Sequence, residues 1–198
     1  MSNIDKLGMG DSFDASVTRN AGSGEQFGLE GRYTFACYDK DGNLKWTDGI
    51  ENLTTNVGRA NLLDSYFANT GGGAVVMGLM TENAVPVSTP AYTDTQSSHA
   101  GWFEAGAANA PTYSGTRKTP SFSSATSANP SVLSTASAVV FSMTGSGDVT
   151  GAFINIGGSS TIDNTTGTLF SAGNFTAGAK SVTSGDTINV TYTLSAAG

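Results

Sequence analysis

From Thr119 to Gly198 the chain has almost no charge, and this feature most limits what it can fold into. The only charged residues in that stretch are Asp148, Asp163, Lys180 and Asp186. The rest is mainly Ser, Thr, Gly, Ala and Asn, interrupted by short apolar runs. Such a composition suits hydrogen-bonded β-structure but lacks most side chains used in acid–base, metal or phosphate chemistry. The stretch therefore predicts architecture more than chemistry.

The basic residues are few and scattered. The net charge is −7, with 9 Lys and Arg in 198 residues, and the longest basic run is Arg117-Lys118. Binding to nucleic acid or to an anionic membrane needs clustered basic side chains facing the phosphates. We therefore expect neither nucleic acid nor a membrane as a partner.

The single cysteine, Cys37, excludes an intramolecular disulfide. It lies in the strand-like run Tyr33–Tyr38, where a buried structural thiol is expected. The N-terminus has no basic segment followed by an apolar stretch, and no window approaches the roughly 18 apolar residues of a membrane helix. These features predict synthesis in the cytosol without a conventional export signal.

The chain divides into an arm and one domain. Residues 1–29 are rich in Gly, Ser, Asn and Asp and follow neither the strand period nor the helix period. Such a segment cannot bury enough apolar surface to order itself, so we expect a flexible N-terminal arm that becomes ordered on a partner. Residues 30–198 have the size of one domain, for which we expect a β-sandwich.

One amphipathic helix is predicted over Thr54–Asn69. Thr54, Thr55 or Asn56 can cap its N-terminus, and the Gly71–Gly73 run ends it. Helical spacing places four apolar residues on the face expected to cover the sheet. These are Val57, Ala60, Leu63 and Phe67.

The remaining regular elements are predicted strands. A hairpin over residues 31–50 has turn chemistry at residues 39–42, which read Asp-Lys-Asp-Gly. Residues 82–100 and 109–130, which contain all 5 prolines, are expected to be irregular. Short strands separated by turn residues are typical of an antiparallel β-sandwich or a jelly roll. The further strands are expected at residues 74–81, 100–104, 136–144, 149–156, 167–171 and 186–195.

No chemical motif is complete. A serine nucleophile needs a Gly-x-Ser-x-Gly turn with a histidine and an acid, and the runs at residues 22–24 and 145–147 lack that pattern. His99 is the only histidine, and we expect it to hydrogen-bond loop backbone. One Cys and one His exclude an ordinary zinc site within a single chain, and no phosphate loop is present. We therefore assign no catalytic, cofactor-binding or metal-binding residue.

The acids around the hairpin leave a less favoured alternative. A calcium loop at residues 39–43 fails, because its Gly stands at the fourth position and the EF-hand needs Gly at the sixth. Paired carboxylates could still serve a polysaccharide hydrolase, although solvated turn acids are the ordinary interpretation. The residues concerned are Asp39, Asp41 and Asn43 for calcium, and Asp39, Asp41, Asp48 and Glu51 for hydrolysis.

Several short phrases between residues 31 and 195 occur in a particular order. They are Trp46–Asp48, Glu51–Gly58, Leu62–Asp64, Ser98–Glu104, Thr150–Phe153, Thr166–Ser171 and Gly185–Leu194. This ordered set resembles a group of small structural proteins of tailed-bacteriophage particles. The N-terminal arm lies outside the resemblance.

The resemblance implies a non-enzymatic virion component that is assembled in the host cytoplasm and needs no cofactor. Within that group, an arm joined to a domain without evident chemistry suggests a capsid decoration (cement) protein. Such a protein would bind the major capsid protein across neighbouring capsomers, with residues 1–29 as its anchor. We also expect it to self-associate as a dimer or trimer.

A tail or head fibre component that binds a host receptor or glycan is the alternative. Aromatic side chains in the loop-rich segments could stack on sugar rings, although packing of the loops onto the sheet is the more common use of such residues. The residues in question are Tyr92, Trp102, Phe103 and Tyr113.

Overall fold

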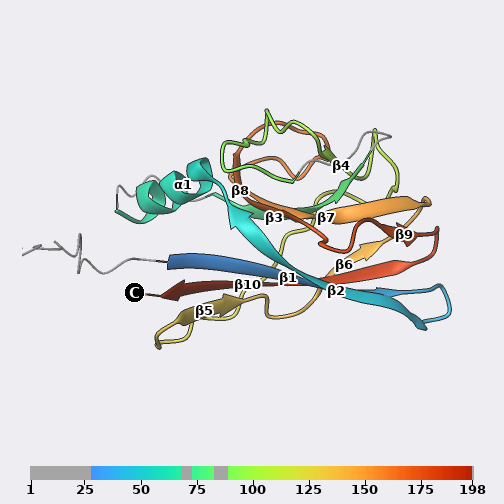
Figure 1. Cartoon of the computed structure of the whole chain (residues 1–198), viewed down its shortest axis with the longest axis horizontal. Coiled ribbons are helices and arrows are strands. Elements are labelled where there is room, and N and C mark those ends of the chain that lie inside the picture. The colour runs from blue at the N-terminus through green and yellow to red at the C-terminus, as the bar shows by residue number, and fades with distance from the viewer. Residues whose placement is uncertain (1–27, 68–72, 83–88, 198) are drawn as a thin grey trace, which may run out of the picture.

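The computed structural model describes residues 28–67, 73–82 and 89–197 (Figure 1). They form a mainly β domain with antiparallel strands and one helix, as the sequence predicted. The predicted arm lies outside the described residues, apart from Gly28 and Leu29, which already belong to the first strand. Strand β1 therefore includes the last two residues that the sequence assigned to the arm.

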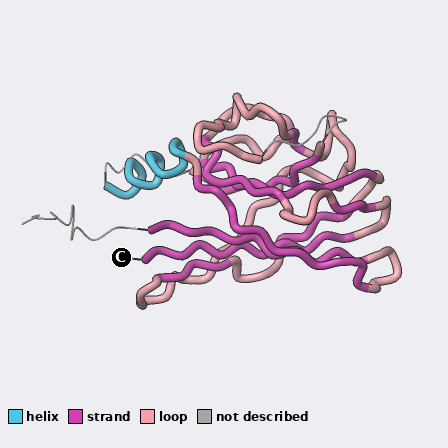
Figure 2. Tube along the Cα trace, in the orientation of Figure 1, coloured by secondary structure: helices cyan, strands magenta, loops and turns pink. Residues whose placement is uncertain are grey.

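The strands form two layers (Figures 1 and 2). In the first layer, β1 lies between β2 and β10, while β5 and β6 pair with successive parts of β10. In the second layer, β7 lies between β3 and β8, with short strands β4 and β9 added at the edges. The first layer contains β1 (Gly28–Tyr38), β2 (Leu44–Thr54), β5 (Ser131–Ser134), β6 (Val139–Ser142) and β10 (Thr187–Ala197). The second contains β3 (Val75–Thr81), β4 (Phe103–Glu104), β7 (Gly147–Ile156), β8 (Thr168–Asn174) and β9 (Lys180–Val182).

Strand β2 connects the two layers. It pairs with β1 as far as Asn52, which lies opposite Gly31. Its last two residues then pair with β8, Leu53 opposite Ala172 and Thr54 opposite Ser171. A strand that passes from one sheet to the other in this way makes a corner of a sandwich, visible in Figure 1 where β2 rises toward β8.

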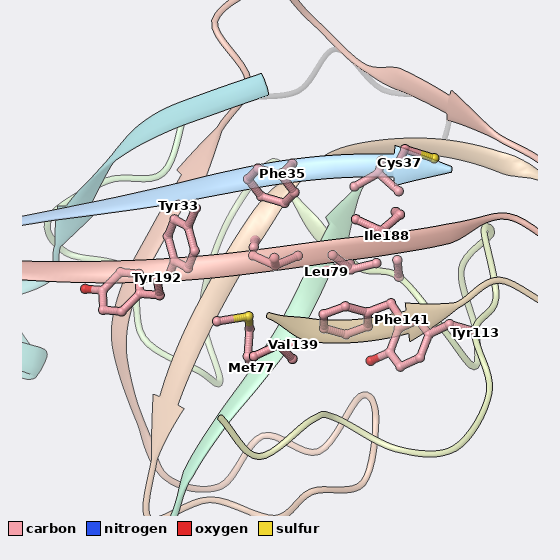
Figure 3. Close-up of a cluster of buried hydrophobic side chains, with 14 of the residues drawn as sticks. Tyr33, Phe35, Cys37, Met77, Leu79, Tyr113, Val139, Phe141, Ile188 and Tyr192 are labelled. Carbon is pink, nitrogen blue, oxygen red and sulfur yellow. The ribbon is translucent and has the colours of Figure 1, made fainter. Parts of the chain in front are cut away.

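The main core lies between the layers (Figure 3). Alternate residues of each strand face inward, so β1 contributes every second side chain. Cys37 is one of them and is fully buried, as the sequence predicted. The labelled side chains of this core are Tyr33, Phe35, Cys37, Met77, Leu79, Tyr113, Val139, Phe141, Ile188 and Tyr192.

Loops cover the outer face of the second layer. Trp102 of the 89–102 loop packs against Phe153 of β7, with ring centroids 5.5 Å apart. Because both faces of β7 are covered, its residues from Val149 to Asn155 are all buried. The buried apolar residues beneath these loops form a second, smaller cluster, which comprises Met80, Trp102, Phe153, Leu169 and Ala172.

Most predicted strands are present, with shifted ends. The strand expected at 100–104 is reduced to β4, because only two residues pair with β3. The sequence missed β5 and β9, which are four and three residues long and are held by pairing with β10 and β7. Elements this short show too little alternation to be recognised.

The helix α1 (Asn56–Phe67) covers one end of β8. Thr55 is the N-cap: its Oγ1 accepts from the Gly58 amide at 2.9 Å, and its own amide donates to Phe170 O at 3.1 Å. Val57 and Ala60, the two residues of the predicted buried face whose side chains the structure describes, are exposed, so the prediction is wrong for both. Gly58 is buried instead, since its missing side chain lets the helix approach Phe170.

This close approach predicts that replacing Gly58 by Ala destabilises the protein, whereas the same change usually stabilises an exposed helix. A Cβ at position 58 would lie 2.4 Å from Phe170 O, so Gly58→Ala should lower the free energy of unfolding by about 1–3 kcal/mol. At an open helical position the same change would stabilise the helix. Ala60→Gly at the exposed site is the control and should cost about 1 kcal/mol through helix propensity. Urea unfolding measures both, and a stabilised Gly58→Ala protein would contradict this packing.

Candidate functional site

A hollow opens where β1 and β2 part, and we call it the β1–β2 hollow. Strand β1 continues through residues 28–30 beyond its last pair with β2, while β2 turns toward β8. The space between them measures about 370 Å³. Its lining residues are Leu29, Glu30, Gly31, Glu51, Asn52, Leu53, Thr54, Arg59 and Tyr92.

Two buried oxygens beside this hollow lack partners among the described residues. Thr54 is 6% exposed, and its Oγ1 makes no hydrogen bond. Asn52 donates through Nδ2 to the Tyr192 hydroxyl at 3.4 Å, but its Oδ1 also accepts nothing. Buried polar atoms are rarely left unbonded, so each such atom needs an explanation.

The outer part of the β1–β2 hollow is aromatic and charged. Tyr92 is 55% exposed, and the Arg59 guanidinium lies 5.4 Å from its ring centroid. The Tyr92 carbonyl accepts from the Asn56 amide at 2.9 Å, which ties this loop to the start of α1. Glu51 is paired with Arg32 at 2.5 Å, and both side chains are exposed. The hollow thus combines a stacking surface with hydrogen-bonding groups of both signs.

A smaller hollow, about 170 Å³, lies beside Phe103 on the loop-covered side of the second layer. Phe103 is 38% exposed. Glu104 also lines this space, but its carboxylate already binds Arg117 and the Asp163 amide. The lining residues are Gln96, His99, Phe103, Glu104, Asn109, Asp163, Asn164 and Thr165.

A buried ion pair joins the loops of this region. Arg117 donates through Nε to Glu104 Oε1 at 2.8 Å and through Nη2 to Oε2 at 2.6 Å. The side chains are 0% and 4% exposed. Arg117 also donates to the carbonyls of Ser159 and Asn164, and Glu104 accepts from the Asp163 amide. This bidentate pair is a structural clamp between the chain around residue 104 and the 158–167 loop.

Two of the four aromatic candidates for sugar stacking are packed inside. Trp102 is 1% exposed and donates through Nε1 to Asp94 at 3.2 Å, while Tyr113 packs edge-on against Phe141. Only Tyr92 and Phe103 of the four are exposed. His99 stacks on Trp102 and contacts its carbonyl through Nδ1 at 3.1 Å, so the expected bond to loop backbone is confirmed.

The hairpin carboxylates do not converge. Asp39 accepts hydrogen bonds from the Asn43 side chain and from the backbone amides of Asn43 and Asp41. These bonds lower the pKa of Asp39, and the bond from the Asn43 side chain has the largest effect. Asp48 and Glu51 are three residues apart on β2 and therefore face opposite sides of the sheet. Each is bonded to a different cation, Lys180 and Arg32.

The four charges of the sequence after Lys118 all have structural partners. Asp148 accepts from Ser181 Oγ, Asp163 accepts from the Ala108 amide, and Lys180 pairs with Asp48 at 3.0 Å. The fourth, Asp186, is bonded by Lys45 and by a backbone amide. Burial acts to raise the pKa of Asp186, but these hydrogen bonds outweigh it and hold the pKa below its usual value.

Among the described residues, neither the Cys37 thiol nor the side chains that could bind a metal form a reactive site. Burial, with the nearby Asp186 carboxylate, raises the pKa of Cys37 to about 11, so the thiol stays protonated near neutral pH. Among residues 28–67, 73–82 and 89–197, no group of three or more His, Cys, Asp or Glu side chains is placed to hold a metal ion. In the same part of the chain, no helix is long and apolar enough to span a membrane.

The chain matches no protein-family model, no curated protein sequence and no solved structure. We therefore infer its function from its own residues and from the ordered set of short sequence phrases.

The buried ion pair can be tested against the exposed one. Glu104→Gln keeps the side-chain shape but leaves the Arg117 charge unpaired, so the free energy of unfolding should fall by about 3–5 kcal/mol. Glu51→Gln breaks the exposed pair with Arg32 and should change it by less than about 1 kcal/mol. Urea titrations of the two variants measure the difference, and equal effects would show that the Glu104 pair is not a clamp.

Proposed function

We propose that this chain is a non-enzymatic structural protein of a tailed-phage particle, acting as a decoration protein that stabilises contacts between capsomers. Its partner on the particle is the major capsid protein. The observation that carries the proposal is the ordered set of phrases that resembles such proteins, together with the way these phrases pack.

The phrases are distant in sequence but meet in the fold. Thr55 of the second phrase donates through Oγ1 to Leu169 O of the Thr166–Ser171 phrase. Trp102 of the Ser98–Glu104 phrase packs on Phe153 of the Thr150–Phe153 phrase. The phrases are therefore parts of one packed structure in this chain, as residues of a single functional domain would be.

The position of the first strand supports an anchoring role for the preceding segment. Gly28 lies opposite Ala197, so the chain enters and leaves the first layer at the same end (Figure 1). Residues 1–27 are therefore joined to the domain at this end of the first layer. Multiple copies on a lattice would offset the entropy lost when such a segment becomes ordered.

Copy number in purified virions distinguishes this proposal from the fibre alternative. A decoration protein should be present at a ratio to the major capsid protein set by the capsid lattice. Quantitative mass spectrometry of intact particles measures that ratio. A number far below that of the capsid protein would point to the tail, neck or a fibre, and complete absence from particles would refute a virion role.

Removal of residues 1–27 tests the anchor while keeping all of β1, which starts at Gly28. The truncated protein should keep the melting temperature of the full chain but lose most of its binding to empty capsids. Co-sedimentation over a range of protein concentrations gives occupancy, with the full chain as control. Undiminished occupancy would rule out the segment as the anchor, while the virion assignment would still depend on copy number.

A further inference from the structure

We propose that the β1–β2 hollow is a carbohydrate-binding site for a short, neutral saccharide. The inference rests on the residues around this hollow and does not depend on the proposed role in a capsid. None of its lining residues takes part in the buried Arg117–Glu104 clamp, and Leu29 is the one that also packs against the core between the layers.

The fold makes this place concave. On one side β1 runs on through Gly28–Glu30 without β2, and on the other β2 bends away over Leu53 and Thr54 to reach β8. Arg59 of α1 and Tyr92 of the 89–102 loop close the outer side. The volume, about 370 Å³, falls in the lower part of the range of small-molecule sites, which is about 300–1,000 Å³.

The lining matches hydroxyl groups better than ions. Glu30 offers carboxylate oxygens that accept from hydroxyls, and Glu51 offers Oε2, since Arg32 bonds its Oε1. Arg59 offers the donors that its bond to Asn56 does not use. The two carboxylates disfavour a phosphate or another anion, while Arg59 disfavours a bound metal cation. Groups of both signs around one hollow suit a neutral ligand that both donates and accepts.

Tyr92 supplies the flat surface that a sugar ring can stack on. More than half of the residue is exposed, yet it is held in place by the Arg59 guanidinium and by the hydrogen bond from Asn56 to its carbonyl. An exposed aromatic ring that is already ordered loses little conformational entropy on binding. Its hydroxyl end stays available for a polar contact.

The unbonded oxygens give an independent reason to expect a ligand. Thr54 Oγ1 and Asn52 Oδ1 are buried beside the hollow with no partner among the described residues. A saccharide hydroxyl, or a water that it orders, would supply the missing hydrogen bond. Thr54 is more than nine-tenths buried, so bulk solvent is not its partner.

The test uses the full chain and a defined set of sugars. Saturation-transfer-difference NMR with D-glucose, D-galactose, N-acetyl-D-glucosamine, L-rhamnose and maltose should show binding of at least one, with a Kd in the millimolar range, about 1–10 mM. Tyr92→Ala should weaken that binding about tenfold, and Tyr92→Phe should retain most of it. Glu51→Gln should also weaken it.

Phe103→Ala is the matched control, because Phe103 is also an exposed aromatic beside a hollow but does not line this one. It should leave sugar binding unchanged, and thermal unfolding confirms that each variant is folded. The proposal fails if no sugar binds at about 20 mM, if Phe103→Ala weakens binding as much as Tyr92→Ala, or if calcium or inorganic phosphate binds in its place. Because purified chain and free sugars are used, failure here would leave particle copy number unaffected.

Discussion

The double pairing of β2 is the constraint on which the rest of the structure depends. Asn52 still pairs with β1, whereas Leu53 and Thr54 already pair with β8. Strand β2 therefore links the two layers into one continuous hydrogen-bonded sheet. The same bend places Thr55 against β8, where it caps α1 and fixes the helix over the end of the second layer. It also separates β2 from the first residues of β1, which creates the hollow between them.

The buried Arg117–Glu104 pair holds together the segments that cover the second layer. Loops around residue 104 and residues 158–167 have little regular hydrogen bonding of their own, and the Arg117–Glu104 pair joins them through two side-chain contacts and three contacts to backbone. A buried pair of this kind contributes little net stability compared with apolar packing, but it penalises any arrangement that leaves one charge alone. With so few charges available, it selects one loop conformation over the second layer.

Local features could be predicted from the sequence, whereas features made by distant segments could not. The turn at residues 39–43 was predictable because the Asp39 carboxylate bonds amides two and four residues away. The short strands β5 and β9 exist only through pairing with β10 and β7. The helix face was misassigned because hydrophobicity marks side chains, and the contact with β8 is made by Gly58, which has none. The β1–β2 hollow was missed since it joins Glu30, Glu51 and Tyr92 only after folding.

The two proposals place function at the same end of the domain. Leu29 and Glu30 line the hollow, and Gly28 alone separates them from residues 1–27, the segment whose removal tests the anchor. A segment bound to a capsid would act on β1 at Gly28–Glu30, where β1 has no β2 partner, and Leu29 and Glu30 of this stretch also line the hollow. Strand β10 holds those residues on their other edge, through pairs from Gly28 to Glu30. Both proposed contacts would therefore act on a stretch of strand that the first layer holds along one edge.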